Sequence, residues 1–152
     1  DGEPDIEVSP ATHRLTMVAA AADGLDGVEA DDTEIQQGGP TYTADTLAAL
    51  AKRYPGAELV LLVGADAAVR MDTWARPEEV RRCATIVVMT RPGSNQIRLP
   101  EGWQYQVLEV PAYDISSTEV RRRVAAGEVI SDLVPAGVAS VIEEVGLYRE
   151  VG

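Results

Sequence analysis

The pattern of hydrophobic positions changes between helical and strand-like several times along the chain. Helices are predicted over about residues 10–22, 44–54, 77–83, 116–126 and 136–145. Continuous apolar runs at residues 59–63 and 85–89 have the length and content of strands buried on both faces. The alternating segment 105–110 predicts another strand, and a short strand is expected between residues 28 and 35. Helices are therefore expected to alternate with strands.

Capping and turn residues mark the ends of several elements. Ser9 is expected to cap the first helix, with Pro10 in its first turn, and Thr43 is expected to cap the second. Pro55-Gly56 ends the second helix, and Gly146 ends the last one.

This alternation predicts an α/β fold with a mostly parallel sheet, right-handed crossovers and flanking helices, formed by residues 1–152 as a single domain. Ligands of such sheets bind at the carboxyl ends of the strands. The loops after residues 63, 89 and 110 lie at those ends, and they carry Asp66, Arg91 and the Ile115–Thr118 stretch. Most of the unusual residues are therefore expected at one edge of the sheet.

Charge and composition exclude several classes of function. A net charge of −12 repels phosphate backbones, so no nucleic-acid partner is expected, and an anionic ligand needs local donors. Cys83 is the only cysteine and His13 the only histidine, which leaves no support for a disulfide, a transition-metal site or a Ser-His-Asp triad. The lone cysteine agrees with a reducing compartment. No apolar stretch approaches the ~20 residues of a membrane span, so no membrane partner is expected.

The segment from Ser116 to Arg121 is the strongest candidate for binding chemistry. Ser116, Ser117 and Thr118 place three hydroxyl groups beside the free N–H groups of a helix start, and Ser116 and Glu119 have the spacing of a capping box. The positive end of the helix dipole favours phosphate there, and Arg121 can fold back toward the same anion. The alternative is an ordinary capped helix with solvated arginines.

Three further segments each have a functional and a structural interpretation. Asp66 follows a strand and Gly64 and can accept hydrogen bonds from a ribose diol, or it can cap a helix. The loop from Gly38 to Thr43 offers N–H groups, hydroxyls and the Tyr42 ring, or is a turn with a cap. Trp74 is either a core residue or a stacking platform for a flat ring. Trp103 is expected to pack on a hairpin or the surface.

Five segments together resemble the bacterial nicotinate-nucleotide adenylyltransferases. Residues 39–47 resemble the family's G-P-S-Y-T-x-D-T-L segment, and Gly64-Ala65-Asp66-Ala67 with Thr73-Trp74 resembles its G-x-D-x-L…W segment. Thr90-Arg91-Pro92-Gly93 resembles its R-P-G turn, and residues 115–121 resemble its I-S-S-T-x-I-R signature. The ending, from Leu133 to Tyr148, also fits. The resemblance covers essentially the whole chain and implies a Rossmann-like nucleotidyltransferase fold.

The resemblance also implies roles for these residues. The enzyme transfers AMP from ATP to nicotinate mononucleotide in NAD biosynthesis, giving deamido-NAD and pyrophosphate, with Mg²⁺ carried on the ATP phosphates. ATP would be bound by Gly64, Asp66, Ser116, Ser117, Thr118 and Arg121. Trp74 would stack on the nicotinate ring, Tyr42 and Thr43 would border the same pocket, and Arg91 would contact a phosphate or the pocket. The protein is expected in the cytoplasm, and whether it forms a homo-oligomer is left open.

One departure from the family concerns catalysis. The family's first strand and its G-x-F-D-P-x-H-x-G-H loop, whose histidines stabilise the triphosphate, have no counterpart in these residues, and His13 lacks the glycine and second histidine around it. We therefore assign no catalytic residue, expect an exposed sheet edge, and expect the 152 residues alone to catalyse poorly. The alternatives are a related pantetheine-phosphate adenylyltransferase and a nucleotide-binding module without activity.

Overall fold

The computed structural model describes residues 9–94 and 96–150. The described chain forms two compact units, which we call the terminal unit and the sheet unit. The terminal unit consists of the described residues of segments 1–35 and 114–152, and the sheet unit is Gln36–Tyr113. We expected residues 1–152 to form a single domain, which requires the two units to pack together. That expectation stays a prediction.

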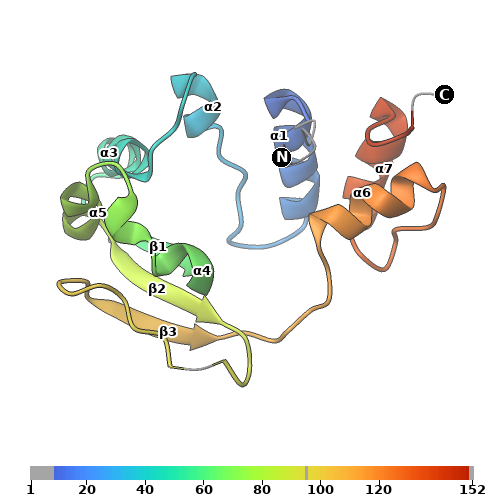
Figure 1. Ribbon diagram of the computed structural model, residues 1–152. Coiled ribbons are helices and arrows are strands. Elements are labelled where there is room, and N and C mark those ends of the chain that lie inside the picture. The colour runs from blue at the N-terminus through green and yellow to red at the C-terminus, as the bar shows by residue number, and fades with distance from the viewer. Residues whose placement is uncertain (1–8, 95, 151–152) are drawn as a thin grey trace, which may run out of the picture. The chain divides into compact units, whose positions relative to one another are not determined.

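The sheet unit contains a parallel three-stranded sheet (Figure 1). Its strands are β1 (Val60–Gly64), β2 (Thr85–Thr90) and β3 (Tyr105–Glu109), in the order β1-β2-β3. Val63 of β1 is opposite Val88 of β2, which is opposite Val107 of β3. The predicted strands therefore form within one residue of their expected bounds, and the α/β class with a parallel sheet is confirmed.

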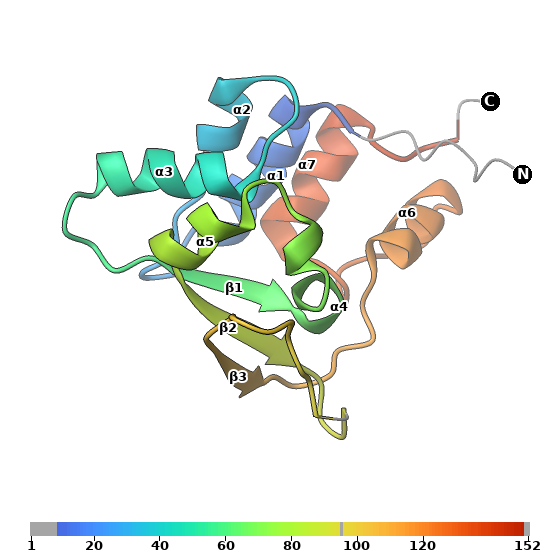
Figure 2. The same ribbon diagram turned by 60° about the vertical axis from the view of Figure 1, so that its left-hand side comes forward.

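Helices of the sheet unit cover one face of the sheet (Figure 2). They are α3 (Thr43–Arg53), the short α4 (Ala65–Ala68), the 3-10 turn η1 (Met71–Thr73) and α5 (Pro77–Cys83). The buried core between helices and sheet consists of Ala44, Leu47, Val63, Ala68, Met71, Val80, Ile86, Val88 and Trp103. The strands supply this core with alternate residues, because successive side chains of a strand point to opposite faces.

The opposite face of the sheet differs from the prediction of strands buried on both sides. Val60 and Leu62 of β1 are 52% and 56% exposed, and Leu108 of β3 is 48% exposed. Register places these three side chains on the same face, away from the helical core. β1 is also an edge strand in the described sheet. The apolar run predicted the strand correctly, but no element in the described residues of the sheet unit covers that face.

The terminal unit contains α1 (Ala11–Ala22), α6 (Ser117–Ala125) and α7 (Ala136–Val145). Helix α1 packs against α7, where a Cβ added to Gly137 would lie 3.3 Å from the Ala20 carbonyl oxygen. A separate apolar core is formed by Val120, Ile130 and Ile142. None of the helices in the described residues is long and apolar enough to cross a membrane.

Three local predictions were wrong. The strand expected between residues 28 and 35 is absent from the described chain, and the short helix α2 (Thr33–Gln37) begins there instead. The first N-cap is Pro10, since the Ser9 hydroxyl is hydrogen-bonded to the Tyr148 hydroxyl at 2.6 Å. The second N-cap is Tyr42, which places Thr43 inside α3 as its first residue. In each case the local sequence signal was displaced by one residue or overridden by packing.

Candidate functional site

The carboxyl edge of the sheet carries Gly64, Asp66 and Arg91, as predicted. Gly64 ends β1 and is opposite Met89 of β2, so the residues that follow both strands emerge at the same edge. Asp66 is in the first turn of α4 and is exposed, and Arg91 follows Thr90, the last residue of β2. Gly64 is the N-cap residue of α4, so the alternative of Asp66 as a helix cap is wrong. Asp66 is exposed to solvent at the end of the sheet where parallel α/β folds generally bind ligands.

The loop that leads into α3 has a backbone that only glycine adopts readily. Gly38 and Gly39 have φ values of 66° and 67°, both in the left-handed region. Tyr42 then takes an extended conformation, and its side chain is 47% exposed. Thr43 is half-buried at the first position of α3. The loop therefore presents an aromatic ring to solvent beside a helix start.

Trp74 follows η1 and packs as the core interpretation predicts, while its stacking role stays a prediction. Its side chain is half-buried and packs against the core of the sheet unit, which leaves part of the indole accessible. Helices α3 and α5 lie side by side (Figure 2), and they are joined by an ion pair in which Arg76 Nη2 is 2.6 Å from Asp45 Oδ1. The segments that carry Tyr42 and Trp74 therefore belong to neighbouring elements.

Trp103 is buried, which corrects the prediction that it packs on a hairpin or the surface. Only 7% of the residue is exposed, and its indole N–H donates to Asp72 Oδ1 at 2.6 Å. The Arg81 guanidinium lies 4.5 Å from the centre of the ring and 2.8 Å from the same carboxylate. Because Asp72 belongs to η1, this cluster anchors the turn that ends at Trp74. Sequence reasoning missed it, since the partners are 9 and 31 residues apart.

The start of α6 has the geometry of a capped helix with accessible donors. Ser116 is the N-cap, and its hydroxyl accepts a hydrogen bond from the Glu119 backbone N–H at 3.1 Å. Ser116, Ser117 and Thr118 are all exposed. The Arg121 guanidinium folds back toward the helix start and donates to the Thr118 hydroxyl at 3.4 Å. The predicted cap is confirmed, and one guanidinium lies beside the exposed hydroxyls at the helix start.

The Glu119 side chain binds arginines further along α6. Its carboxylate accepts hydrogen bonds from Arg122 and Arg123, which lower the pKa of Glu119 from its ordinary value of 4.5 to about 2. Arg122 also pairs with Glu128, and Arg123 with Asp132. Arg122 and Arg123 are therefore engaged with carboxylates, whereas Arg121 points to the helix start.

Titration of Glu119 tests this ion-pair network. Because the folded pKa is depressed, its contribution to α6 stability is present above pH 4.5 and is lost as the pH falls toward 2. NMR titration of this carboxyl group should give a higher pKa in Arg122→Ala than in the unaltered protein. A carboxyl group that titrates near 4.5 in the unaltered protein would contradict the network.

A cavity of about 320 Å³ in the terminal unit lies beside the start of α6. Ser117 and Arg121 line it, together with Arg14 of α1 and the hydrogen-bonded pair Ser9 and Tyr148. The cavity thus brings a second guanidinium, that of Arg14, to the hydroxyl-rich helix start. Sequence reasoning missed Arg14, because nothing in its own helix indicates a ligand.

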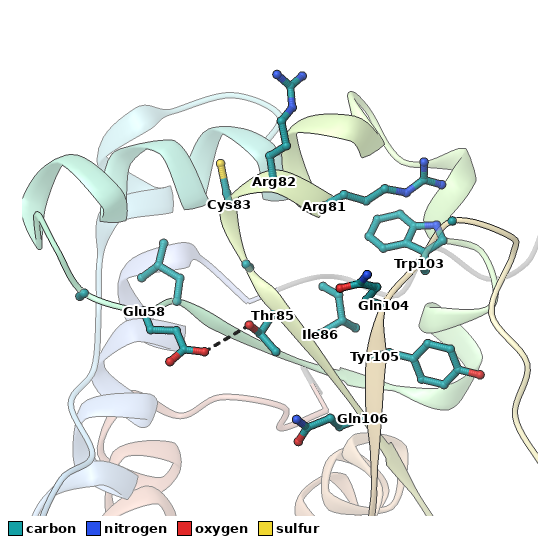
Figure 3. Close-up of a pocket in the computed structure, with 14 residues that line it drawn as sticks. Glu58, Arg81, Arg82, Cys83, Thr85, Ile86, Trp103, Gln104, Tyr105 and Gln106 are labelled. Carbon is teal, nitrogen blue, oxygen red and sulfur yellow. Dashed lines mark hydrogen bonds between the residues drawn. The ribbon is translucent and has the colours of Figure 1, made fainter.

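A larger cavity, of about 610 Å³, lies at the opposite end of the strands from Gly64, Asp66 and Arg91 (Figure 3). The cavity is lined at the amino ends of the three strands by Leu59, Thr85 and Tyr105. Trp103 and Glu58 also line it, and the Glu58 carboxylate accepts a hydrogen bond from the Thr85 hydroxyl. None of the ten predicted site residues lines it. Because parallel sheets bind ligands at the carboxyl ends of strands, volume alone does not identify the functional site here.

The ten predicted residues fall into two groups. Six belong to the sheet unit, namely Tyr42, Thr43, Gly64, Asp66, Trp74 and Arg91, and Ser116, Ser117, Thr118 and Arg121 belong to the terminal unit. Their union in one cleft stays a prediction. No cluster of three or more His, Cys, Asp or Glu side chains suited to a metal ion occurs in the part of the chain that the structure describes.

Comparison with known proteins gives the family context of these residues. Residues 3–123 match the model of the cytidylyltransferase-like family. Two curated relatives named "Probable nicotinate-nucleotide adenylyltransferase" are each 42% identical to the chain. The one from Corynebacterium kroppenstedtii is aligned over 95% of this chain and 70% of its own length. The one from Saccharopolyspora erythraea is aligned over 93% and 68%, respectively.

A solved structure supports the fold independently of close sequence similarity. The nicotinic acid mononucleotide adenylyltransferase of Plasmodium falciparum, solved with the ligand APC, has a TM-score of 0.68 and 18% identity, over 93% of this chain and 77% of that one. Together with the parallel sheet and the capped α6, these matches confirm the resemblance seen in the five sequence segments. The chain belongs to the cytidylyltransferase-like family and, within it, to the nicotinate-nucleotide adenylyltransferases.

Proposed function

We propose that this protein transfers AMP from ATP to nicotinate mononucleotide, giving deamido-NAD and pyrophosphate. The observation that carries the proposal is the 42% identity to curated nicotinate-nucleotide adenylyltransferases along 95% of the chain. The exposed, capped start of α6, with Arg121 folded toward it, supports the same conclusion, because it suits a phosphate-bearing substrate. An activity in NAD biosynthesis follows from this substrate and product.

The residues proposed to bind ATP lie at the start of α6, in the terminal unit, and at the carboxyl edge of the sheet, in the sheet unit. Ser116, Ser117 and Thr118 offer hydroxyl and backbone donors to phosphate oxygens, and Arg121 adds a charge-assisted hydrogen bond. The cavity beside them adds Arg14 as a second cation. Asp66 accepts hydrogen bonds from a ribose, and the absence of a side chain at Gly64 lets the nucleotide approach the backbone.

The proposed acceptor site is built from two segments. One carries Tyr42 and Thr43 at the start of α3, and the other carries Trp74 shortly before α5. Trp74 offers a ring face for stacking on nicotinate, and the exposed Tyr42 ring and the Thr43 hydroxyl border the same space. Arg91, exposed at the end of β2, is assigned to the mononucleotide phosphate or the pocket rim. Arginine is suited to this position, since its planar guanidinium binds phosphate in a bidentate way.

The chemistry requires positioning more than covalent catalysis. An oxygen of the mononucleotide phosphate attacks the α-phosphorus of ATP in line, the new P–O bond forms, and the bond to the β-phosphate breaks to release pyrophosphate. We assign no side chain of this chain to proton transfer. ATP enters with Mg²⁺ on its phosphates, and the protein aligns the reacting groups and stabilises charge on the phosphates.

The assay uses the full-length gene product with Mg²⁺, ATP and one acceptor at a time. Nicotinate mononucleotide should yield deamido-NAD and pyrophosphate in equal amounts, whereas phosphopantetheine should yield no adenylylated product. Nicotinamide mononucleotide, as a third acceptor, measures the preference for the ring carboxylate. Binding of ATP without pyrophosphate release from any acceptor would refute the proposal and indicate a nucleotide-binding module.

The activity of the 152-residue chain alone is a separate prediction. The histidine-containing loop that the resemblance implies is not among these residues, so poor turnover is expected even where ATP binds. Calorimetry on this chain should detect substrate binding when the assay detects little product. Normal turnover by the 152 residues would show that the loop's histidines are dispensable here. The cytoplasmic location also stays a prediction.

A further inference from the structure

Arg76 has an unusual backbone conformation between Trp74 and helix α5. Its φ and ψ are 51° and 57°, in the left-handed region that non-glycine residues rarely adopt. It also precedes Pro77, and a residue before proline is normally extended. Such conformations persist only where the surrounding structure holds them, and they gather at functional sites. In the turn after Trp74, the backbone therefore adopts a conformation that its local sequence disfavours.

The shortest charged contact of Arg76 is its ion pair with Asp45. The two charged atoms are 2.6 Å apart, whereas the second carboxylate, that of Glu79, is 3.6 Å away. The hydrogen bond to Asp45 is also the main cause that raises the pKa of Arg76 above its ordinary value, and the Tyr42 phenol makes a smaller contribution. Both side chains are about half exposed, so the pair contributes little to global stability.

The ion pair spans the two segments proposed to hold nicotinate mononucleotide. Asp45 is in the first turn of α3, two residues after Thr43 and three after Tyr42. Arg76 is the N-cap of α5, two residues after Trp74. A closed pair fixes the direction in which the chain leaves Trp74 relative to the start of α3. Loss of the pair releases a left-handed turn whose own sequence favours an extended backbone.

We propose that Arg76 and Asp45 are positioning residues for the mononucleotide pocket, and that their ion pair sets the Trp74 indole against Tyr42 and Thr43. This inference rests on the proposed function and adds a determinant of acceptor affinity that touches no reacting atom. It predicts an effect on nicotinate mononucleotide that ATP does not share.

The test compares Asp45→Asn with Glu78→Gln in the full-length gene product. Both substitutions remove one carboxylate from an arginine pair of 2.6 Å that involves α5. The partner of Glu78, Arg81, keeps a second carboxylate, that of Asp72, at 2.8 Å. Asp45→Asn should raise KM for nicotinate mononucleotide roughly five- to tenfold, below the ~100-fold cost of a 1 Å misplacement. KM for ATP and Tm should barely change. Glu78→Gln should leave all three near their original values.

Two further variants separate the ion pair from the backbone strain. Arg76→Gly fits the left-handed turn without strain but lacks the guanidinium, so it should raise the same KM. The exchange of Asp45→Arg with Arg76→Asp restores an ion pair, since Asp tolerates the left-handed region, and should recover part of the affinity. If Asp45→Asn lowers Tm strongly, Arg76→Gly decides the question.

The outcomes distinguish this inference from the proposed function. An unaltered enzyme that adenylylates nicotinate mononucleotide, with the same KM in Asp45→Asn and Arg76→Gly, would overturn the positioning role alone. An unaltered enzyme that forms no deamido-NAD would overturn the proposed function. A KM that rises equally for ATP and the mononucleotide indicates a general structural role and also overturns the inference.

Discussion

Replacement of Trp74 by alanine is expected to weaken binding of nicotinate mononucleotide roughly 5- to 150-fold, the range that corresponds to about 1–3 kcal/mol for base–aromatic stacking. Binding of ATP should change by no more than about twofold, because ATP is assigned to Asp66 and the start of α6. Calorimetric dissociation constants for each ligand measured separately, before any reaction, give this comparison directly.

Trp74→Phe is the matched control for this prediction. Phenylalanine keeps a ring that can pack on the core and stack on nicotinate, so it should retain most of the affinity. Because Trp74 also packs against the core, Tm must be measured in both variants. Equal losses for ATP and the mononucleotide in Trp74→Ala, at unchanged Tm, would contradict the stacking role.

Replacement of Arg121 by alanine is expected to weaken ATP binding by about 10- to 100-fold, since a hydrogen bond to a charged group contributes roughly 1.5–3 kcal/mol. The structure supports this choice of residue, because the Arg121 guanidinium points to the Thr118 hydroxyl at the helix start. The loss should grow smaller at high salt, because screening weakens phosphate contacts. KM and kcat for ATP, at saturating nicotinate mononucleotide, provide the measurement.

Arg122→Ala is the matched control for Arg121→Ala. Arg122 is the next residue of α6, but its guanidinium is bound to Glu119 and Glu128. Its loss should change the titration of Glu119 while leaving ATP kinetics nearly unaltered. If both alanine variants impair ATP use equally, the effect comes from the charge of α6 in general, and Arg121 has no specific role.

Local sequence signals predicted the regular elements of the sheet unit well. Helix α5 occupies residues 77–83 as predicted, because Pro77 favours a first helical turn and acidic residues follow it there. The strands at 60–64 and 85–90 are within one residue of the two apolar runs. These signals depend on neighbouring residues only, so they can be read without knowledge of the tertiary structure.

Features that depend on distant partners were missed. Trp103 is buried because Asp72 and Arg81, far away in sequence, supply a hydrogen bond and a cation over its ring. Val60 and Leu62 are exposed because the described helices of the sheet unit gather on one face. Hydrophobicity along a strand indicates that it can be buried, but it does not say which elements arrive to cover it.

Two local features of the candidate site were predicted, namely the strand ends that carry Gly64, Asp66 and Arg91, and the Ser116 cap. Gly64, Asp66 and Arg91 reach one edge because parallel strands align their ends, and the Ser116 cap forms because its signal is local. Arg14 and the Arg76–Asp45 pair were missed, since each depends on contacts between helices. Motifs thus point to the residues assigned to ligands, whereas the cavity beside Arg14 and the Arg76–Asp45 ion pair are visible only in three dimensions.

Gly64 offers a way to separate the demands of folding from those of binding. Its φ of −67° is available to any residue, and a methyl group built on it would meet no atom of the protein within 4 Å. Within the described residues, the fold therefore gains no room from glycine at the end of β1. An effect of alanine at this position that leaves the fold intact would report on the molecule bound at this edge of the sheet.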